Sequence, residues 1–161
     1  MPRLKTLLKN KLKGAARVAV LAVGSPLRGD DASGLLAVEG LGKSGNLRVF
    51  YGGSAPENLT GLVKRFNPTH LIVIDSADFK ARPGSVRILG LRQITGDSFS
   101  THRLPLDMLV SYFSLELRCR VIVIGIQPKS IKFSSPVSPQ VKRGAAKLRA
   151  ALKEIFAELN L

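Results

Sequence analysis

The sequence predicts an α/β fold built around a mostly parallel sheet, and two observations point to it. Short, uniformly apolar runs, typical of strands covered on both faces, alternate with segments whose apolar residues recur at helical spacing. The length of 161 residues suits one domain that buries its own core without a disulfide or a metal. No apolar run reaches the roughly 20 residues that a membrane span requires. We therefore treat residues 1–161 as a single domain.

The first element is a basic amphipathic segment, residues 1–16, with a helix predicted from residue 4 to residue 14. Leucines fall on one face of that helix and lysines on the other. The leucines of the apolar face are Leu4, Leu7, Leu8 and Leu12. We expect this face to dock on the domain itself, with a partner protein or a membrane surface as the alternatives.

The remaining elements alternate along the chain. Apolar runs predict five strands, at 18–23, 47–51, 70–74, 85–91 and 120–126. Arginines interrupt the fourth run, which suits a strand at the edge of the sheet. Helices are predicted at 31–43, 56–66, 106–117 and 138–159. Ser54 and Glu57 have the spacing of a capping box. We prefer that interpretation of Ser54 to a nucleophile, because the surrounding sequence is not G-x-S-x-G.

The charge is strongly basic, with 25 Lys and Arg against 11 Asp and Glu and a net charge of +14. Such a charge attracts nucleic acid, anionic membranes or acidic proteins, and solubility alone also accounts for it. The basic residues are dispersed and lack the interleaved aromatic residues of a single-strand-binding groove. We expect no nucleic-acid partner, and keep a non-catalytic module that binds RNA or an acidic protein as the rival interpretation.

The cysteine content and the first 17 residues bear on the compartment. The chain has one cysteine, Cys119, which cannot form an internal disulfide, and residues 1–17 lack the apolar core of a secretory signal. We expect a cytoplasmic protein. Arg118 and Arg120 flank Cys119 and favour a thiolate, but a cysteine entering an apolar strand is more often part of the core.

Acidic residues gather where apolar strands end. Asp30 and Asp31 follow a strand and a tight glycine loop, and Asp75 and Asp78 follow the run 70–74. The carboxyl ends of parallel strands are where open α/β sheets bind ligands, so these carboxylates are candidates for chemistry. For Asp75, a structural role remains an equal alternative, because a carboxylate at this place needs solvent, amide donors or a cation.

One histidine extends this set. His102 lies in a polar loop or at the start of the helix predicted at 106–117, whereas His70 precedes a strand with no acid beside it. A lone histidine is more often a surface residue than a ligand. His102 is a candidate ligand only if its loop reaches the edge of the sheet that holds Asp31 and Asp75. These three side chains would offer two oxygens and one nitrogen to a divalent transition metal, which suggests metal-assisted hydrolysis. The phosphate-binding, dinucleotide-binding and zinc-protease motifs are absent.

Several motifs resemble those of the hydrogenase maturation endopeptidases. They are G-x-x-x-x-G-D-D at 24–31 with a glycine shortly after, G-G-S-A-P-E-N at 52–58, the apolar strand ending in Asp75, T-H-x-x-P-L at 101–106 and G-I-Q-P at 125–128. Their order is similar to that of the HycI-like branch, which processes the large subunit of hydrogenase 3, the formate-hydrogenlyase type. The resemblance runs from about residue 18 to residue 156 and leaves the N-terminal helix outside it.

The resemblance implies a three-layer α/β/α sandwich with a twisted five-stranded sheet, and an endopeptidase. Family members remove the C-terminal extension of the [NiFe]-hydrogenase large-subunit precursor after nickel insertion. By position in the motifs, Asp31, Asp75 and His102 become the catalytic and metal-recognition residues, and Asp30 takes a supporting or capping role. The cofactor implied is nickel (Ni²⁺), presented by the precursor. We expect a monomer without stable membrane insertion.

Two positions depart from the family pattern. Ser25 stands where asparagine is usual, and Tyr51 stands before the glycine pair where aspartate is common. The first change alters the side-chain hydrogen bonds that tie down the loop. A second rival, a metal-dependent hydrolase of small substrates, would hold a metal of its own, so the metal content of the purified protein separates it from the protease.

Overall fold

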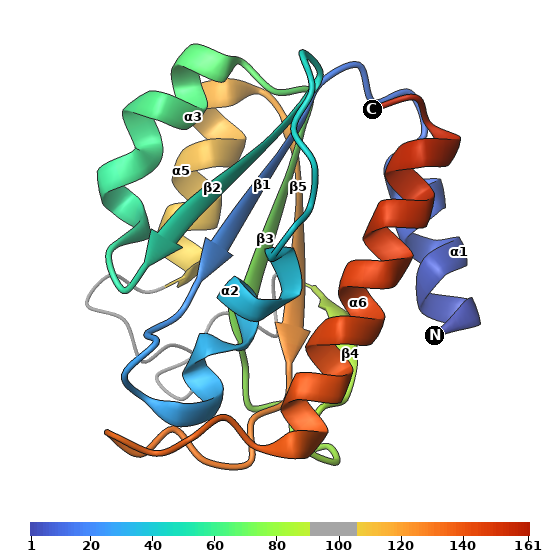
Figure 1. Cartoon of the computed structure of the whole chain (residues 1–161). Helices are drawn as coiled ribbons and strands as arrows, with labels where there is room; N and C mark the ends of the chain where they lie inside the picture. Colours follow the sequence, from blue (N-terminus) through green and yellow to red (C-terminus); the bar gives the residue numbers. More distant parts are fainter. Residues whose placement is uncertain (91–105) are drawn as a thin grey trace.

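The computed structural model describes residues 1–90 and 106–161, and in these ranges five strands form one sheet (Figure 1). The strands are β1 (Val18–Val23), β2 (Leu47–Gly53), β3 (His70–Ser76), β4 (Val86–Leu89) and β5 (Arg120–Ile126). Their order in the sheet is β2-β1-β3-β5-β4. β1, β2, β3 and β5 pair in parallel, and β4 pairs antiparallel to β5 at the edge. The mostly parallel sheet and the edge position of the fourth strand are thus confirmed.

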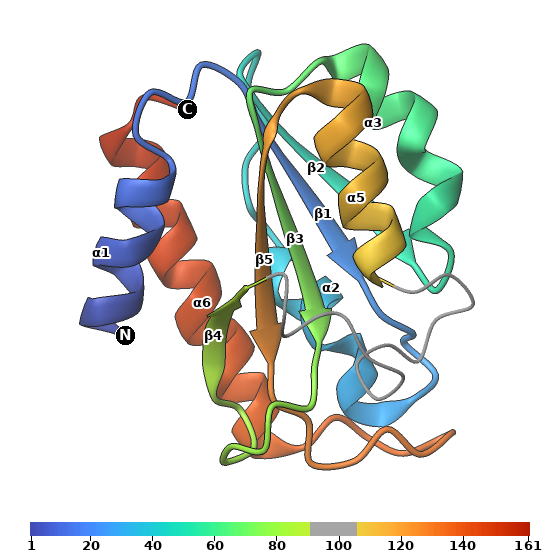
Figure 2. The same ribbon diagram turned by 180° about the vertical axis from the view of Figure 1, so that it is seen from behind.

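Helices cover both faces of this sheet and complete three layers (Figures 1 and 2). On one face lie α1 (Pro2–Lys11), α2 (Ser33–Val38) and α6 (Pro139–Glu158), and on the other lie α3 (Thr60–Phe66) and α5 (Leu106–Leu117). Every side chain of β1 and β3 is buried, because these central strands have a helical layer on each side. No helix in the described parts of the chain has the length and apolar character to cross a membrane.

Two predicted helices differ from the structure at their ends. The helix predicted at 31–43 is a 3-10 turn, η1 (Gly29–Ala32), followed by the short α2, because Glu39 leaves the helical conformation and Gly40 has a φ of +62°. The capping box was also wrong. Ala55 precedes the 3-10 turn η2 (Pro56–Leu59), no side chain caps it, and the Ala55 N–H donates to the Gly52 carbonyl at 3.2 Å instead.

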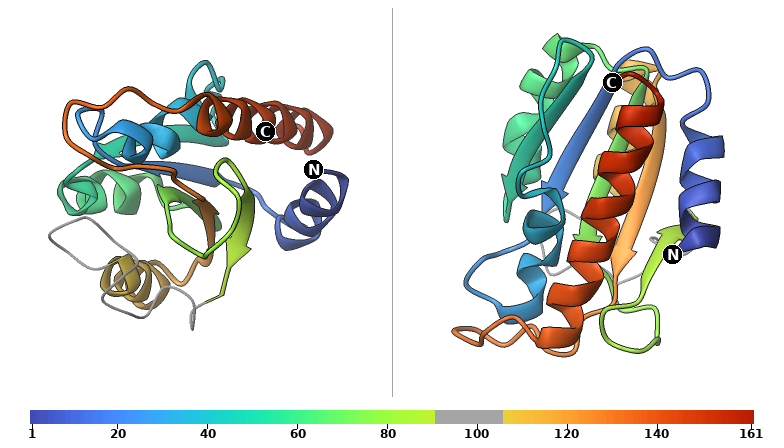
Figure 3. Two further views of the ribbon diagram at one scale, coloured as in Figure 1. Left: turned by 90° about the horizontal axis from the view of Figure 1, so that it is seen from below. Right: turned by 45° about the vertical axis from the view of Figure 1, so that its right-hand side comes forward.

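The N-terminal helix docks on its own domain, as expected, beside α6 (Figure 3). It ends at Lys11, earlier than predicted, and Leu7 is 45% exposed rather than part of the docked face. Leu8 and Leu12 have no exposed surface. Lys5 of α1 pairs with Glu154 of α6 at 2.8 Å.

His70 is a buried histidine at the first position of β3, at the amino edge of the sheet and far along the strand from Asp75. Its Nδ1 lies 3.1 Å from the Thr69 hydroxyl. Burial, together with the positive charge of Arg120, lowers the pKa of His70 below its usual value of 6.5. The folded protein therefore favours the neutral imidazole.

This burial predicts a stability that depends on pH. The unfolded chain protonates His70 at its ordinary pKa near 6.5, whereas the folded chain resists protonation until a lower pH. The free energy of unfolding should therefore be highest above about pH 6.5 and fall as the pH drops through that value. Urea unfolding between pH 5.5 and 7.5 measures it, with His70→Gln as the comparison. An equally steep decline in His70→Gln would contradict the assignment to His70.

Candidate functional site

Asp31 and Asp75 lie at the carboxyl edge of the sheet, at the ends of the adjacent strands β1 and β3. Each carboxylate is only 1% exposed. The Ser25 N–H donates to Asp31 Oδ2 at 2.9 Å, and the Ser76 N–H donates to Asp75 Oδ1 at 2.7 Å. β3 continues through Asp75 and Ser76, two residues beyond the predicted end, and Asp75 pairs with Gly125 of β5.

Two glycines allow the segment that carries Asp31 to sit directly on the strand ends. Gly24 has a φ of +133°, and a Cβ there would overlap the Asp31 carbonyl oxygen. A Cβ on Gly34, in the first turn of α2, would overlap the carbonyl oxygens of Val23 and Ile74. The glycine shortly after the G-D-D motif is therefore a contact point, because α2 touches the backbones of β1 and β3 at this place.

Asp30 holds a distant loop with its buried carboxylate. Its Oδ2 accepts hydrogen bonds from the Lys129 N–H at 2.8 Å, the Ser130 N–H at 3.1 Å and the Ser138 hydroxyl at 3.0 Å. Its Oδ1 accepts from the Ser138 N–H at 2.6 Å. Asp30 thus supports the site by fixing the loop from 129 to 138 beneath η1, and Arg28 rather than Asp30 occupies the capping position of η1.

Gln127 organises the loop after Asp75. In the sequence it is recognised only as part of the G-I-Q-P motif, with no role assigned to it. Its Oε1 accepts from the Phe79 N–H at 2.9 Å and the Ala81 N–H at 3.1 Å. Its Nε2 donates to Asp78 Oδ1 at 3.1 Å and to the Pro128 carbonyl at 3.2 Å. The Lys80 ammonium and the Lys80 N–H, and after them the Gln127 amide, lower the pKa of Asp78 to about 2. The sequence shows only a glutamine directly after an apolar strand, and its burial becomes visible in the structure.

The third predicted site residue, His102, lies outside the described residues. Asp31 and Asp75 are brought to one edge of the sheet, and in residues 1–90 and 106–161 no group of three His, Cys, Asp or Glu side chains could hold a metal ion. Asp31 and Asp75 offer two oxygen donors, and a complete ligand set would need further donors from His102 or from a bound substrate.

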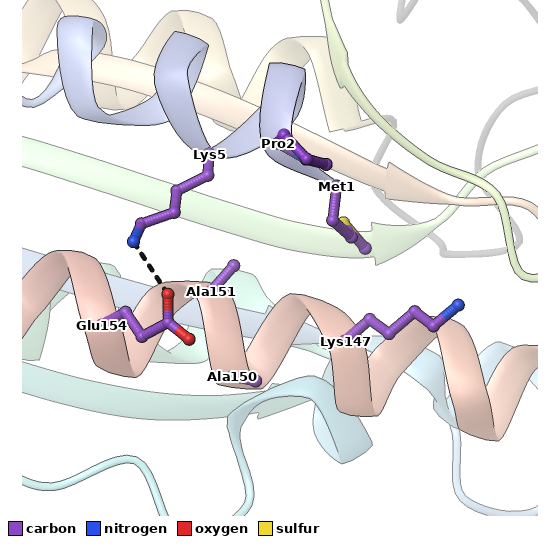
Figure 4. Close-up of a pocket in the computed structure, with 7 residues that line it drawn as sticks. All are labelled: Met1, Pro2, Lys5, Lys147, Ala150, Ala151 and Glu154. Carbon is purple, nitrogen blue, oxygen red and sulfur yellow. Dashed lines mark hydrogen bonds and ion pairs between the residues drawn. The ribbon is translucent and has the colours of Figure 1, made fainter.

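The other candidates from the sequence lie elsewhere. Cys119 is buried, and burial raises the pKa of its thiol, which confirms a core cysteine rather than an activated one. A cavity of about 480 Å³ lies between α1 and α6, lined in part by Lys5, Lys147 and Glu154 (Figure 4). It contains none of the predicted site residues.

Comparison with known proteins gives consistent matches. A family model described as hydrogenase maturation protease, HycI, matches residues 36–157, a range that includes Asp75 and His102 but not Asp31. A protein of Methanocaldococcus jannaschii, named as a hydrogenase maturation protease, is 36% identical across 98% of this chain and 99% of its own length. The hydrogenase 3 maturation protease of Escherichia coli K12 is 35% identical over 76% of this chain and 80% of its own.

A solved structure matches over nearly the whole chain. The crystal structure of the [NiFe] hydrogenase maturation protease HycI from Thermococcus kodakarensis superposes with a TM-score of 0.86 and 28% identity. The match covers 94% of this chain and 99% of that one. The α/β sandwich predicted from the sequence is therefore a fold that this relative shares.

Proposed function

The chain belongs to the hydrogenase maturation proteases of the HycI family, and on this premise we propose that it cleaves a [NiFe]-hydrogenase large-subunit precursor. The reaction is hydrolysis of the peptide bond that joins the C-terminal extension to the mature subunit, after nickel has been inserted. The observation that carries the proposal to this site is the pair Asp31 and Asp75, two carboxylates with 1% exposure at neighbouring strand ends. The reaction is inferred from family membership, and the residues that perform it are inferred from their place at the carboxyl edge of the sheet.

Nickel reaches the enzyme, in this proposal, as part of the substrate. A buried carboxylate has lost much of its hydration, so a cation that arrives with the precursor gains a strong electrostatic interaction with it. Oxygen and imidazole donors suit divalent nickel, so Asp31, Asp75 and His102 would complete a coordination shell begun by the precursor's cysteines. Nickel held there would polarise the scissile carbonyl or make a bound water more acidic. A precursor without nickel lacks this central contact.

The experiment that tests the function compares nickel-loaded and nickel-free precursor. Each is incubated with the purified protein, and the C-terminal mass is read by mass spectrometry. We expect loss of the extension from the loaded precursor alone. If a folded enzyme cleaves neither form of its cognate precursor, the proposed function is wrong. If it cleaves both forms at the same rate, nickel is not the recognition element.

The setting of this reaction is also part of the proposal. We infer a monomer that acts in the cytoplasm on a protein, without a nucleic-acid partner or stable insertion into a membrane. The apolar face of α1, which would otherwise suit a membrane surface, packs against the domain through Leu4, Leu8 and Leu12. That packing leaves the lysines of α1 for solvent and for the ion pairs with α6.

A further inference from the structure

Two large apolar side chains stand exposed at the same edge as the candidate site. Leu27, in the loop after β1, is 61% exposed, and Phe133, in the loop between β5 and α6, is 66% exposed. Both side chains belong to loops beneath α2 at the carboxyl end of the sheet (Figure 1). We name Leu27 and Phe133, with loop residues 25–28 and 131–135, the apolar prong.

The two loops of the apolar prong are joined to each other. The Ser134 N–H donates to the Leu27 carbonyl at 2.8 Å, and the Asp30 N–H donates to the Ser130 carbonyl at 3.0 Å. The Ser25 hydroxyl accepts a hydrogen bond from the Leu27 N–H at 3.3 Å. The apolar side chains are therefore presented on a backbone that is already ordered, which lowers the entropic cost of binding.

The two chain segments that form the apolar prong carry basic side chains and no acidic ones. Arg28, Lys129 and Lys132 are all exposed, and residues 24–29 and 128–139 contain no acid. The two acids that follow at once, Asp30 and Asp31, are buried. A partner that fits this surface offers apolar side chains together with carboxylates.

We propose that the apolar prong docks the segment of the large-subunit precursor next to the cleavage site, and that this segment carries an apolar residue flanked by acidic ones. The proposal rests on the proposed function. The Ser25 N–H donates to Asp31 Oδ2, and Ser25 is two residues from Leu27, so a chain bound to the apolar prong would lie near Asp31. A second copy of the protein is a poor occupant, because it would bring a net charge of +14 against the same charge.

The first test removes the apolar side chains. We expect Leu27→Ser/Phe133→Ser to raise KM for the nickel-loaded precursor about tenfold or more with kcat little changed, because exposed anchors contribute to ground-state and transition-state binding alike. Leu115→Ser is the matched control, since Leu115 is 79% exposed on α5. Thermal unfolding should be unchanged in both variants. An unchanged KM in the double variant would overturn the proposal.

The second test addresses the charge. KM of the wild type should rise with ionic strength, and replacing Arg28, Lys129 and Lys132 with Gln should flatten that dependence. A control variant removes the same number of exposed charges remote from the prong, at Lys13, Lys43 and Lys153. Equal salt dependence in the two triple variants would contradict an acidic docking segment.

Two further outcomes distinguish docking of the precursor from failure of the proposed function and from self-association. If the wild type does not cleave the loaded precursor, the proposed function fails, and direct binding of precursor to wild type and double variant still tests the apolar prong. If the wild type elutes as a dimer and Leu27→Ser/Phe133→Ser as a monomer, the prong is a self-association surface and the docking proposal is wrong.

Discussion

Asp75→Asn should abolish cleavage of the nickel-loaded precursor while the protein stays folded. The substitution keeps the shape of the side chain and an acceptor for the Ser76 N–H, but it removes a negative charge at the carboxyl edge. If that charge binds the cation or the reacting groups, the rate should fall on the order of a thousandfold. Stability should be unchanged or higher, because the amide is less costly to bury than the carboxylate. The C-terminal mass of the precursor and the thermal unfolding curve measure the two effects.

The same reasoning applies to Asp31→Asn and to His102→Ala, and each should lose cleavage. The matched control is Asp78→Asn, the same chemical change three residues from Asp75. Asp78 is partly exposed, and its bonds go to Lys80 and Gln127 rather than toward a buried site, so we expect this variant to keep its activity. Cleavage at the wild-type rate by any of the three site variants would remove that residue from the mechanism.

Gly34→Ala should cause a large loss of stability, although it adds only one methyl group to the protein. The new Cβ would overlap the carbonyl oxygens of Val23 and Ile74, and neither strand can retreat, because both lie in the centre of the sheet. We expect the free energy of unfolding to fall by about 3 kcal/mol, the upper range for overpacking. Urea unfolding followed by circular dichroism measures it.

Gly61→Ala is the control for this prediction, because it adds the same methyl to an exposed helix. The nearest atom to the added Cβ would be an Arg65 guanidinium nitrogen at 4.0 Å. Alanine is the better helix former, so this variant should be about 0.5 to 1 kcal/mol more stable than the wild type. If both variants had the same stability, the close approach of α2 to the strands would be wrong.

Much of the fold follows from apolar patterning, because burial on both faces selects the same residue types along a whole strand. β5 and α5 have the predicted bounds for this reason. The apolar pattern predicted too long a helix at 31–43, because buried residues continue beyond the end of α2. Leu41 is only 9% exposed and belongs to the core, so the apolar spacing ran past Glu39, where α2 has already ended. Local spacing cannot show which buried residues lie on a helix and which on a turn.

The site was only partly predictable from the sequence. Residues beside a strand could be identified, whereas roles that depend on partners far away in the sequence could not. Asp31 and Asp75 could be named because acids next to apolar strands are conspicuous in a sequence. The role of Asp30 depends on Ser138, which lies 108 positions away, and the role of Gln127 depends on the loop around Phe79. Such hydrogen bonds join loops that are adjacent only after the sheet has formed, so one sequence carries no sign of their partners.

The contact between α1 and α6 has a consequence for the kinetics of unfolding. Lys5 and Glu158 are 153 positions apart, so few contacts in the chain close a longer loop. Long loops are entropically costly to close, and we expect α1 to add its contacts after the transition state for folding. Contacts made that late slow unfolding without speeding folding. The buried Leu8 of α1 and Leu12, which follows the helix, would therefore lower the unfolding rate and leave the folding rate nearly unchanged.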